Sequence, residues 1–131
     1  AGISELEGIA KTNTDVGKLA KFALAQTRFD DGKYDEAATL YQELIALPDA
    51  VVAKETINFQ LAKTFEKQSK TKEAADLYFT IAKTAAEAKD SDGKPVPMGE
   101  TANEAKEKLT ALDAERAKEI VVPTPESPFG N

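Results

Sequence analysis

The distribution of hydrophobic and polar positions predicts a chain built mainly from amphipathic helices. Apolar residues recur at three- and four-residue spacing over most of the sequence, and glycine and proline separate the periodic segments. Residues 24–44 (LAQTRFDDGKYDEAATLYQEL) and 61–81 (LAKTFEKQSKTKEAADLYFTI) resemble each other at an offset of 37 residues. The positions that coincide are Leu24 with Leu61, Ala25 with Ala62, Ala37 with Ala74, Ala38 with Ala75, Leu40 with Leu77, and Tyr41 with Tyr78. A repeat of this length, with a turn residue between two helical patterns, predicts stacked pairs of helices and an all-α fold.

The first repeat is predicted over residues 16–47. Asp15 is the expected N-cap of a helix that ends near Asp31, because its carboxylate can accept hydrogen bonds from the free N–H groups of the first turn. Gly32 is expected to end this helix, since glycine adopts the left-handed conformation without steric penalty. The second helix of the pair is then expected to continue to a turn at Pro48.

The second repeat is predicted over residues 51–88, with its first helix beginning at Val51. Ser69 occupies the turn position at which the first repeat has glycine. Ala37 and Ala74 are expected where the two helices of each pair cross most closely, because a larger side chain would push the helices apart. The sequence therefore predicts two related helical hairpins.

The flanking segments complete one predicted domain over residues 1–122. Residues 3–11 are predicted to form a short apolar-faced helix, interpreted as the end of a preceding repeat, with a plain N-terminal capping helix as the alternative. Residues 89–98 contain glycine and two prolines and are predicted to be a loop. Residues 99–120 are predicted to form one closing helix, apolar on one face and charged on the other. The proline-rich tail, 123–131, cannot continue that helix.

Composition limits the functions that are open to the chain. The 131 residues carry a net charge of -6, which argues against general nucleic-acid binding. Histidine and cysteine are absent, so thiol chemistry, Ser-His-Asp catalysis and ordinary zinc sites are excluded. Asp90, Asp92 and Gly93 resemble a fragment of a calcium loop, but the closing glutamate is missing, and a solvated turn is the simpler interpretation. We expect no enzyme activity, no metal and no cofactor.

The first repeat resembles a tetratricopeptide repeat (TPR). The matching positions are Leu24 and Ala25 in the first helix, Gly32 and Tyr34 at the turn, and Ala37, Tyr41 and Pro48 in and after the second helix. The second copy keeps most of them, but it has serine at the turn, and the period exceeds the usual 34 residues of the family. The resemblance implies a right-handed superhelical stack of antiparallel hairpins, with about two repeats and flanking helices.

The wider layout is similar to bacterial TPR proteins that are exposed to the periplasm behind an N-terminal membrane anchor. Members of that group act as adaptors or chaperone-like partners in envelope protein translocation and assembly. The resemblance implies a non-enzymatic protein-binding scaffold, and an anchor would then lie upstream of Ala1. No window of this sequence approaches the length of a membrane span. A cytoplasmic adaptor is the alternative.

In such repeats the first helices line a concave surface that takes a peptide or a partner helix. Carried onto this sequence, the partner-binding residues are Phe22, Gln26, Phe29, Asp30, Phe59, Gln60, Lys63, Glu66 and Lys67. Phenylalanines beside lysines suit an apolar segment that carries acidic residues. Packing of the phenylalanines against neighbouring helices remains an alternative. Self-association into homo-oligomers through exposed apolar surface is the second functional hypothesis.

Overall fold

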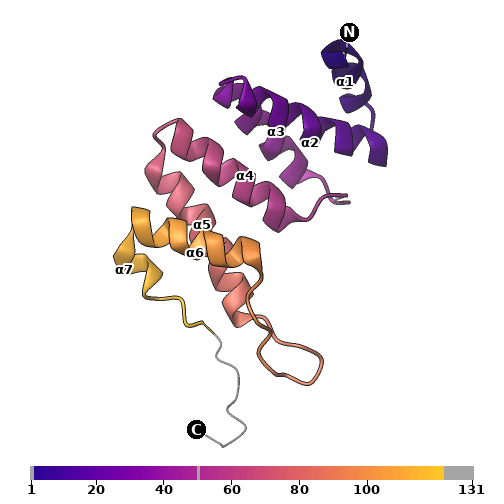
Figure 1. Cartoon of the computed structure of the whole chain (residues 1–131). Helices are drawn as coiled ribbons and strands as arrows, with labels where there is room; N and C mark the ends of the chain where they lie inside the picture. The colour runs from indigo at the N-terminus through magenta and orange to yellow at the C-terminus, as the bar shows by residue number, and fades with distance from the viewer. Residues whose placement is uncertain (1, 50, 123–131) are drawn as a thin grey trace, which may run out of the picture. The chain divides into compact units, whose positions relative to one another are not determined.

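The computed structural model confirms an all-α chain over the residues it describes, 2–49 and 51–122 (Figure 1). The helices are α1 (Gly2–Ala10), α2 (Asp15–Asp30), α3 (Tyr34–Ala46), α4 (Lys54–Lys67), α5 (Thr71–Glu87), α6 (Glu100–Leu112) and α7 (Ala114–Ala117). None of the helices in these ranges is long and apolar enough to cross a bilayer. The predicted tail, 123–131, lies outside the described residues.

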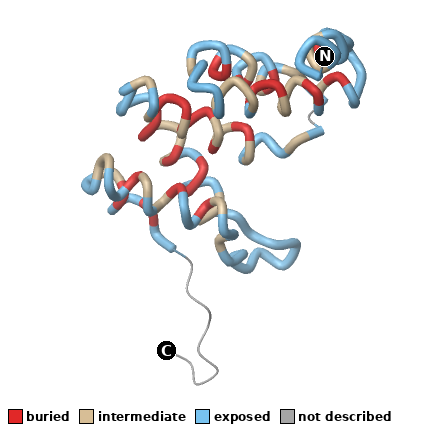
Figure 2. Tube along the Cα trace, turned by 45° about the horizontal axis from the view of Figure 1, so that its top comes forward, coloured by how far each residue is buried: buried red, intermediate tan, exposed pale blue. Residues whose placement is uncertain are grey.

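The chain divides into two compact units, Ala1–Ala74 and Ala75–Asn131, and the division falls inside α5. In the first unit, α1 packs on α2, α2 on α3, and α3 on α4. In the second unit, α6 packs on α7. Buried positions recur about once per turn along the helices, as the amphipathic pattern predicts (Figure 2).

The two repeats have the same backbone turn although their turn residues differ. Gly32 has a φ of 77° and Ser69 a φ of 62°, so both lie in the left-handed region. At each turn this residue donates its N–H to a carbonyl three residues back at 3.0 Å. The next residue, Lys33 or Lys70, donates to a carbonyl five residues back at 2.8 Å. This is the Schellman pattern of a helix C-terminus, and it is repeated at the offset of 37 residues.

The core positions of the repeats also correspond. Ala37 and Ala74 are both 0% exposed, which confirms their predicted burial. In each of the other matched pairs the two residues are buried to a similar extent. Buried pairs are Leu24 and Leu61, Ala25 and Ala62, Ala38 and Ala75, and Tyr41 and Tyr78, and the half-buried pair is Leu40 and Leu77. The similarity in sequence therefore extends to the environment of each side chain.

The junction between α1 and α2 differs from the prediction in its capping residue. Thr14, and not Asp15, is the N-cap, and its Oγ1 accepts a hydrogen bond from the Gly17 N–H at 2.9 Å. The helix begins one residue earlier than predicted, which puts Asp15 in its first turn, where a negative charge suits the helix dipole. A Cβ on Gly17 would lie 2.3 Å from the Thr12 carbonyl oxygen, so only glycine permits this close approach.

The first helix of the second repeat begins at Lys54, three residues after the predicted start at Val51. Val51 and Val52 are β-branched and form helix less readily than most residues. The connection is also tied to α2, because the Lys18 Nζ donates to the Asp49 carbonyl at 2.8 Å.

The single closing helix predicted over 99–120 is wrong, because the chain breaks at Asp113 (φ -153°, ψ 83°) into α6 and α7. The Asp113 carboxylate accepts a hydrogen bond from the Arg116 N–H at 3.2 Å and so caps α7. Arg116 in turn forms an ion pair with Asp76 and places its guanidinium 4.3 Å from the centre of the Phe79 ring. These contacts hold α7 on α5 within the second unit.

Candidate partner-binding site

A surface hollow of about 330 Å³ is formed by side chains from α2, α3 and α4, all within the first unit. Its lining residues are Gln26, Phe29 and Asp30 from α2, Tyr41 from α3, and Gln60 and Lys63 from α4. Five of these six are predicted partner-binding residues. The structure therefore brings predicted residues from α2 and α4 together in one concave surface. We call this surface the α2–α4 hollow.

Lys63 supplies the positive charge of the hollow. Its Nζ lies 5.8 Å from the centre of the Phe29 ring and 5.8 Å from the centre of the Phe59 ring. Both distances are in the range of a cation–π interaction. No carboxylate among the described residues forms an ion pair with this ammonium. Lys63 is thus positioned by two aromatic rings and keeps its charge available to a ligand.

The two phenylalanines have different positions in the site. Phe29 is half-buried, lines the hollow, and packs edge-on against Tyr34 with 5.3 Å between the ring centres. Phe59 is only 7% exposed. Phe59, one of the predicted partner-binding residues, therefore packs inward and supports Lys63, which agrees with the packing alternative for this residue.

Tyr41 is the one lining residue of the hollow that is not among the predicted partner-binding residues. It is 0% exposed, and its ring packs edge-on against Phe22 at 5.9 Å between centres. Its hydroxyl oxygen is buried and has no hydrogen-bond partner among the described residues. Burial, together with the negative charge of Asp30, raises the pKa of Tyr41 to about 12. The phenol therefore stays protonated and is a hydrogen-bond donor at neutral pH.

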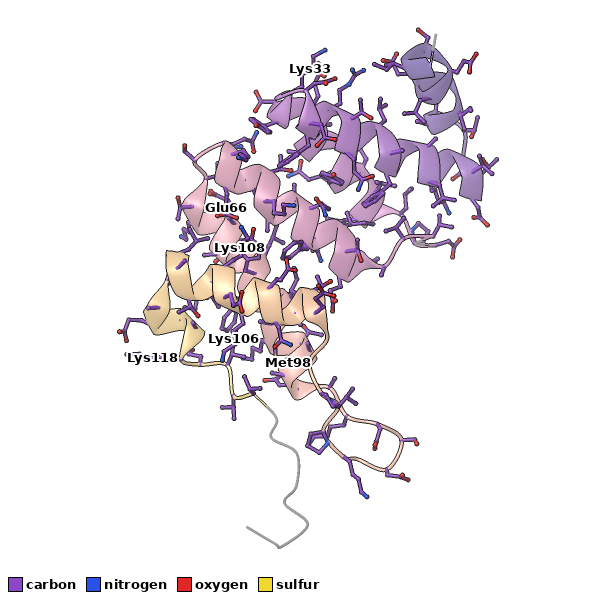
Figure 3. The ribbon with its side chains drawn as sticks, viewed as in Figure 1. Lys33, Glu66, Met98, Lys106, Lys108 and Lys118 are labelled. Carbon is purple, nitrogen blue, oxygen red and sulfur yellow. The ribbon has the colours of Figure 1, made fainter. Side chains whose placement is uncertain are left out.

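The other residues predicted to bind a partner lie outside the lining of the hollow. Phe22 is half-buried and packs edge-on against Tyr41, which agrees with the packing alternative for this residue. Glu66 is half-buried on the last turn of α4 (Figure 3). Lys67 is exposed on the same turn. Contact between these two residues and a partner stays a prediction.

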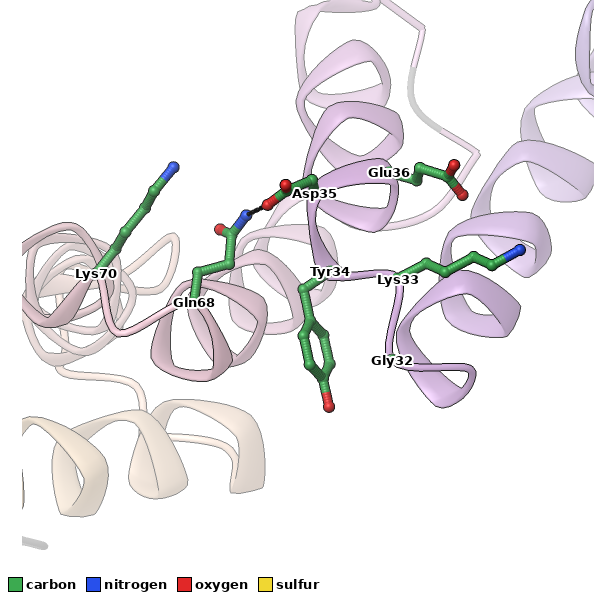
Figure 4. Close-up of a pocket in the computed structure, with 7 residues that line it drawn as sticks. All are labelled: Gly32, Lys33, Tyr34, Asp35, Glu36, Gln68 and Lys70. Carbon is green, nitrogen blue, oxygen red and sulfur yellow. Dashed lines mark hydrogen bonds between the residues drawn. The ribbon is translucent and has the colours of Figure 1, made fainter.

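A second hollow, of about 530 Å³, lies at the first repeat turn and is a structural junction (Figure 4). Gln68 donates its side-chain N–H to a carboxylate oxygen of Asp35 at 2.5 Å, which links the end of α4 to the start of α3. Lys33 and Lys70 point in different directions, as Figure 4 shows. Because the charges do not converge, this hollow offers no defined site for a ligand.

The loop before α6 forms a self-contained turn. The Asp90 Oδ1 accepts hydrogen bonds from the Asp92 N–H at 2.8 Å and the Lys94 N–H at 3.0 Å. This carboxylate is thus occupied by backbone groups of its own loop. Within residues 2–49 and 51–122, no three acidic side chains gather as metal ligands would.

The α2–α4 hollow brings several kinds of chemical group together on one surface. It combines a buried phenol, two side-chain amides, one carboxylate and one ammonium. Comparisons with models of protein families, with curated proteins and with solved structures found no match to this chain.

Proposed function

We propose that this protein is a non-enzymatic interaction scaffold that binds a peptide or a partner helix of another protein in the α2–α4 hollow. The observation that carries the proposal is the convergence of Gln26, Asp30, Gln60 and Lys63 on one concave surface, where their side chains have no ion-pair or hydrogen-bond partner in the described structure. Groups of this kind are open to a ligand. A rim of polar groups around an aromatic floor is also a common composition of protein interfaces.

The architecture that we propose is a right-handed superhelical stack of TPR-like hairpins. It is supported by the equivalent turns at Gly32 and Ser69 and by the equal burial of Ala37 and Ala74. Stacked hairpins of this kind present extended concave surfaces for other proteins. We assign no catalytic role, because the chain has no histidine or cysteine and its motifs select no pair of carboxylates.

We further propose that the scaffold works as an adaptor or a chaperone-like partner in the bacterial cell envelope, with a membrane anchor upstream of Ala1. The support is the resemblance of the helical layout to periplasmic TPR proteins. Reading the gene upstream of Ala1 tests this location. An apolar segment of about 20 residues supports the anchored protein, and its absence favours a cytoplasmic adaptor.

Selection from a phage-displayed library of random twelve-residue peptides tests the binding proposal. We expect the wild-type chain to enrich a family of related peptides. Gln26→Ala and Lys63→Ala should weaken these peptides severalfold, because they remove open polar groups from the hollow. Gln42→Ala and Lys54→Ala are the matched controls, since both residues are exposed and lie outside the hollow. Equal weakening by the site variants and the controls would refute the assignment of the hollow.

The second candidate function is self-association into homo-oligomers. It is favoured by apolar side chains that remain exposed on α1 and α2: Ile3 is 44% exposed, Ile9 42%, Val16 64% and Leu19 48%. Exposed apolar surface of this kind often marks an interface. Light scattering over a wide concentration range tests the hypothesis, with Leu19→Glu as the disrupting variant. A wild-type chain that stays monomeric at every concentration removes it.

A further inference from the structure

We propose that the α2–α4 hollow recognises the main chain of an internal stretch of the partner, with the Tyr41 hydroxyl donating to a peptide carbonyl and Asp30 accepting a peptide N–H. The inference rests on the proposed scaffold function and specifies the group that is bound. It distinguishes a peptide backbone from a free carboxylate, such as a chain terminus or an acidic side chain.

The buried hydroxyl of Tyr41 is the first step of the argument. A hydroxyl without a hydrogen-bond partner is unfavourable in a protein interior, and most buried polar groups are paired. Tyr41 is 0% exposed and lines the hollow, yet its oxygen has no partner among the described residues. Phenylalanine would fill the same space without this penalty. The hydroxyl is therefore best explained by a ligand that accepts a hydrogen bond from it.

The charge next to this hydroxyl selects a neutral acceptor. Asp30 lines the same hollow and lies close enough to Tyr41 to raise its pKa. A carboxylate that approached the phenol would meet the negative charge of Asp30, and like charges repel. A peptide carbonyl carries no net charge. It can therefore accept from Tyr41 without this repulsion.

The remaining lining groups fit the alternating donors and acceptors of a peptide backbone. Asp30 can accept an N–H, and the side chains of Gln26 and Gln60 each carry both a donor and an acceptor. Lys63 balances the charge of Asp30, which leaves the hollow close to neutral. A site for a free carboxylate would instead present donors alone. The mixture found here matches a peptide group, which presents one N–H and one C=O.

Tyr41→Phe is the decisive variant, with Tyr34→Phe as the matched control. Tyr34 packs against Phe29 but does not line the hollow. We expect Tyr41→Phe to keep or raise the melting temperature, because it removes an unpaired buried hydroxyl. The same variant should weaken an enriched library peptide by roughly tenfold, which is the loss of about one hydrogen bond. Tyr34→Phe should leave the affinity within about twofold.

Chemical changes in the peptide identify the group that is recognised. Converting the terminal carboxylate to an amide should leave binding unchanged. Replacing one internal peptide bond with an ester removes one N–H and makes one carbonyl a weaker acceptor. When each peptide bond is replaced in turn, the ester at one position should lower the affinity of the peptide for the wild-type protein. The loss of affinity caused by the ester at that position should be much smaller in Asp30→Ala or Tyr41→Phe than in the wild type, because these variants have already lost the side chain that contacts the altered group.

Three results would overturn the inference, and they separate it from the proposed function. Undiminished peptide binding by Tyr41→Phe refutes main-chain recognition and leaves the scaffold function in place. Loss of binding on amidation shows that the site holds a chain terminus. A library that yields no peptide specific to the hollow refutes the proposed function, and the inference fails with it.

Discussion

Exchanging the two turn residues tests whether the repeats share one turn. Gly32→Ser should destabilise the fold, because a side chain at a φ of 77° is strained. Left-handed backbone costs roughly 1–2 kcal/mol for a residue with a Cβ, and the reduced freedom of the unfolded chain offsets about 0.4–1 kcal/mol of this. A Cβ at Gly32 meets no atom within 4 Å, so no clash adds to the strain. The expected net loss is about 1 kcal/mol.

Ser69→Gly should have the opposite effect by the same reasoning. Serine at a φ of 62° bears the strain that glycine avoids, so the variant should gain about 1 kcal/mol. The double variant, Gly32→Ser with Ser69→Gly, should return to nearly the wild-type stability, because effects at separate sites add to within about 0.5 kcal/mol.

Urea unfolding followed by circular dichroism at the helical band measures these differences. A change of 1 kcal/mol shifts the midpoint by roughly 0.3–1 M for a chain of this size. Ser69→Ala is the control, since it keeps the Cβ and removes a hydroxyl that has no hydrogen bond in the described structure. Its midpoint should match the wild type. A neutral Gly32→Ser, or a destabilising Ser69→Gly, would show that the turns are not equivalent.

Three further predictions concern packing and pH. Ala37→Leu should lose roughly 1–3 kcal/mol of unfolding free energy by overpacking a fully buried position, whereas Ala46→Leu, on an exposed turn of α3, should lose little in the same urea titration. Gly17→Ala should separate α1 from α2 and speed hydrogen exchange in α1, because its Cβ would collide with backbone oxygen. Tyr41 has a folded pKa of about 12 against an ordinary value of 10.0, so stability should be constant below about pH 10 and then fall by about 1–3 kcal/mol as the pH rises towards 12. Tyr41→Phe should lack this part of the alkaline loss.

The internal repeat made much of the local structure predictable. An offset of 37 residues aligned the turn at Gly32 with Ser69, and both adopt the left-handed conformation. Periodicity also identified the buried faces, because burial in a helix follows the position around its axis. The five predicted residues that line the α2–α4 hollow came instead from the resemblance to a tetratricopeptide repeat, in which the first helices line the concave surface.

Local capping explains where the prediction of helix ends failed. The apolar positions continue from α6 through Ala117 and Ile120, so periodicity alone indicates one helix. Asp113 interrupts it because its carboxylate offers the Arg116 N–H an alternative partner. An aspartate three residues before arginine in a helical pattern is too common to mark a break by itself. The decisive contacts of Arg116, with Asp76 and the Phe79 ring, come from a distant part of the sequence.

Tyr41 shows why the chemistry of the hollow could not be obtained from periodicity. The pattern places its ring in the core, and the structure confirms that burial. Periodicity says nothing about the ring's far end, which reaches the hollow beside Asp30 on another helix. The one available indication was the choice of tyrosine over phenylalanine at a core position, since a buried hydroxyl is retained at low cost only where it finds a partner. The Tyr41 hydroxyl has no hydrogen-bond partner among the described residues, and under the proposal of main-chain recognition a bound peptide supplies it. A residue that belongs to the core by its position would then serve recognition by its hydroxyl.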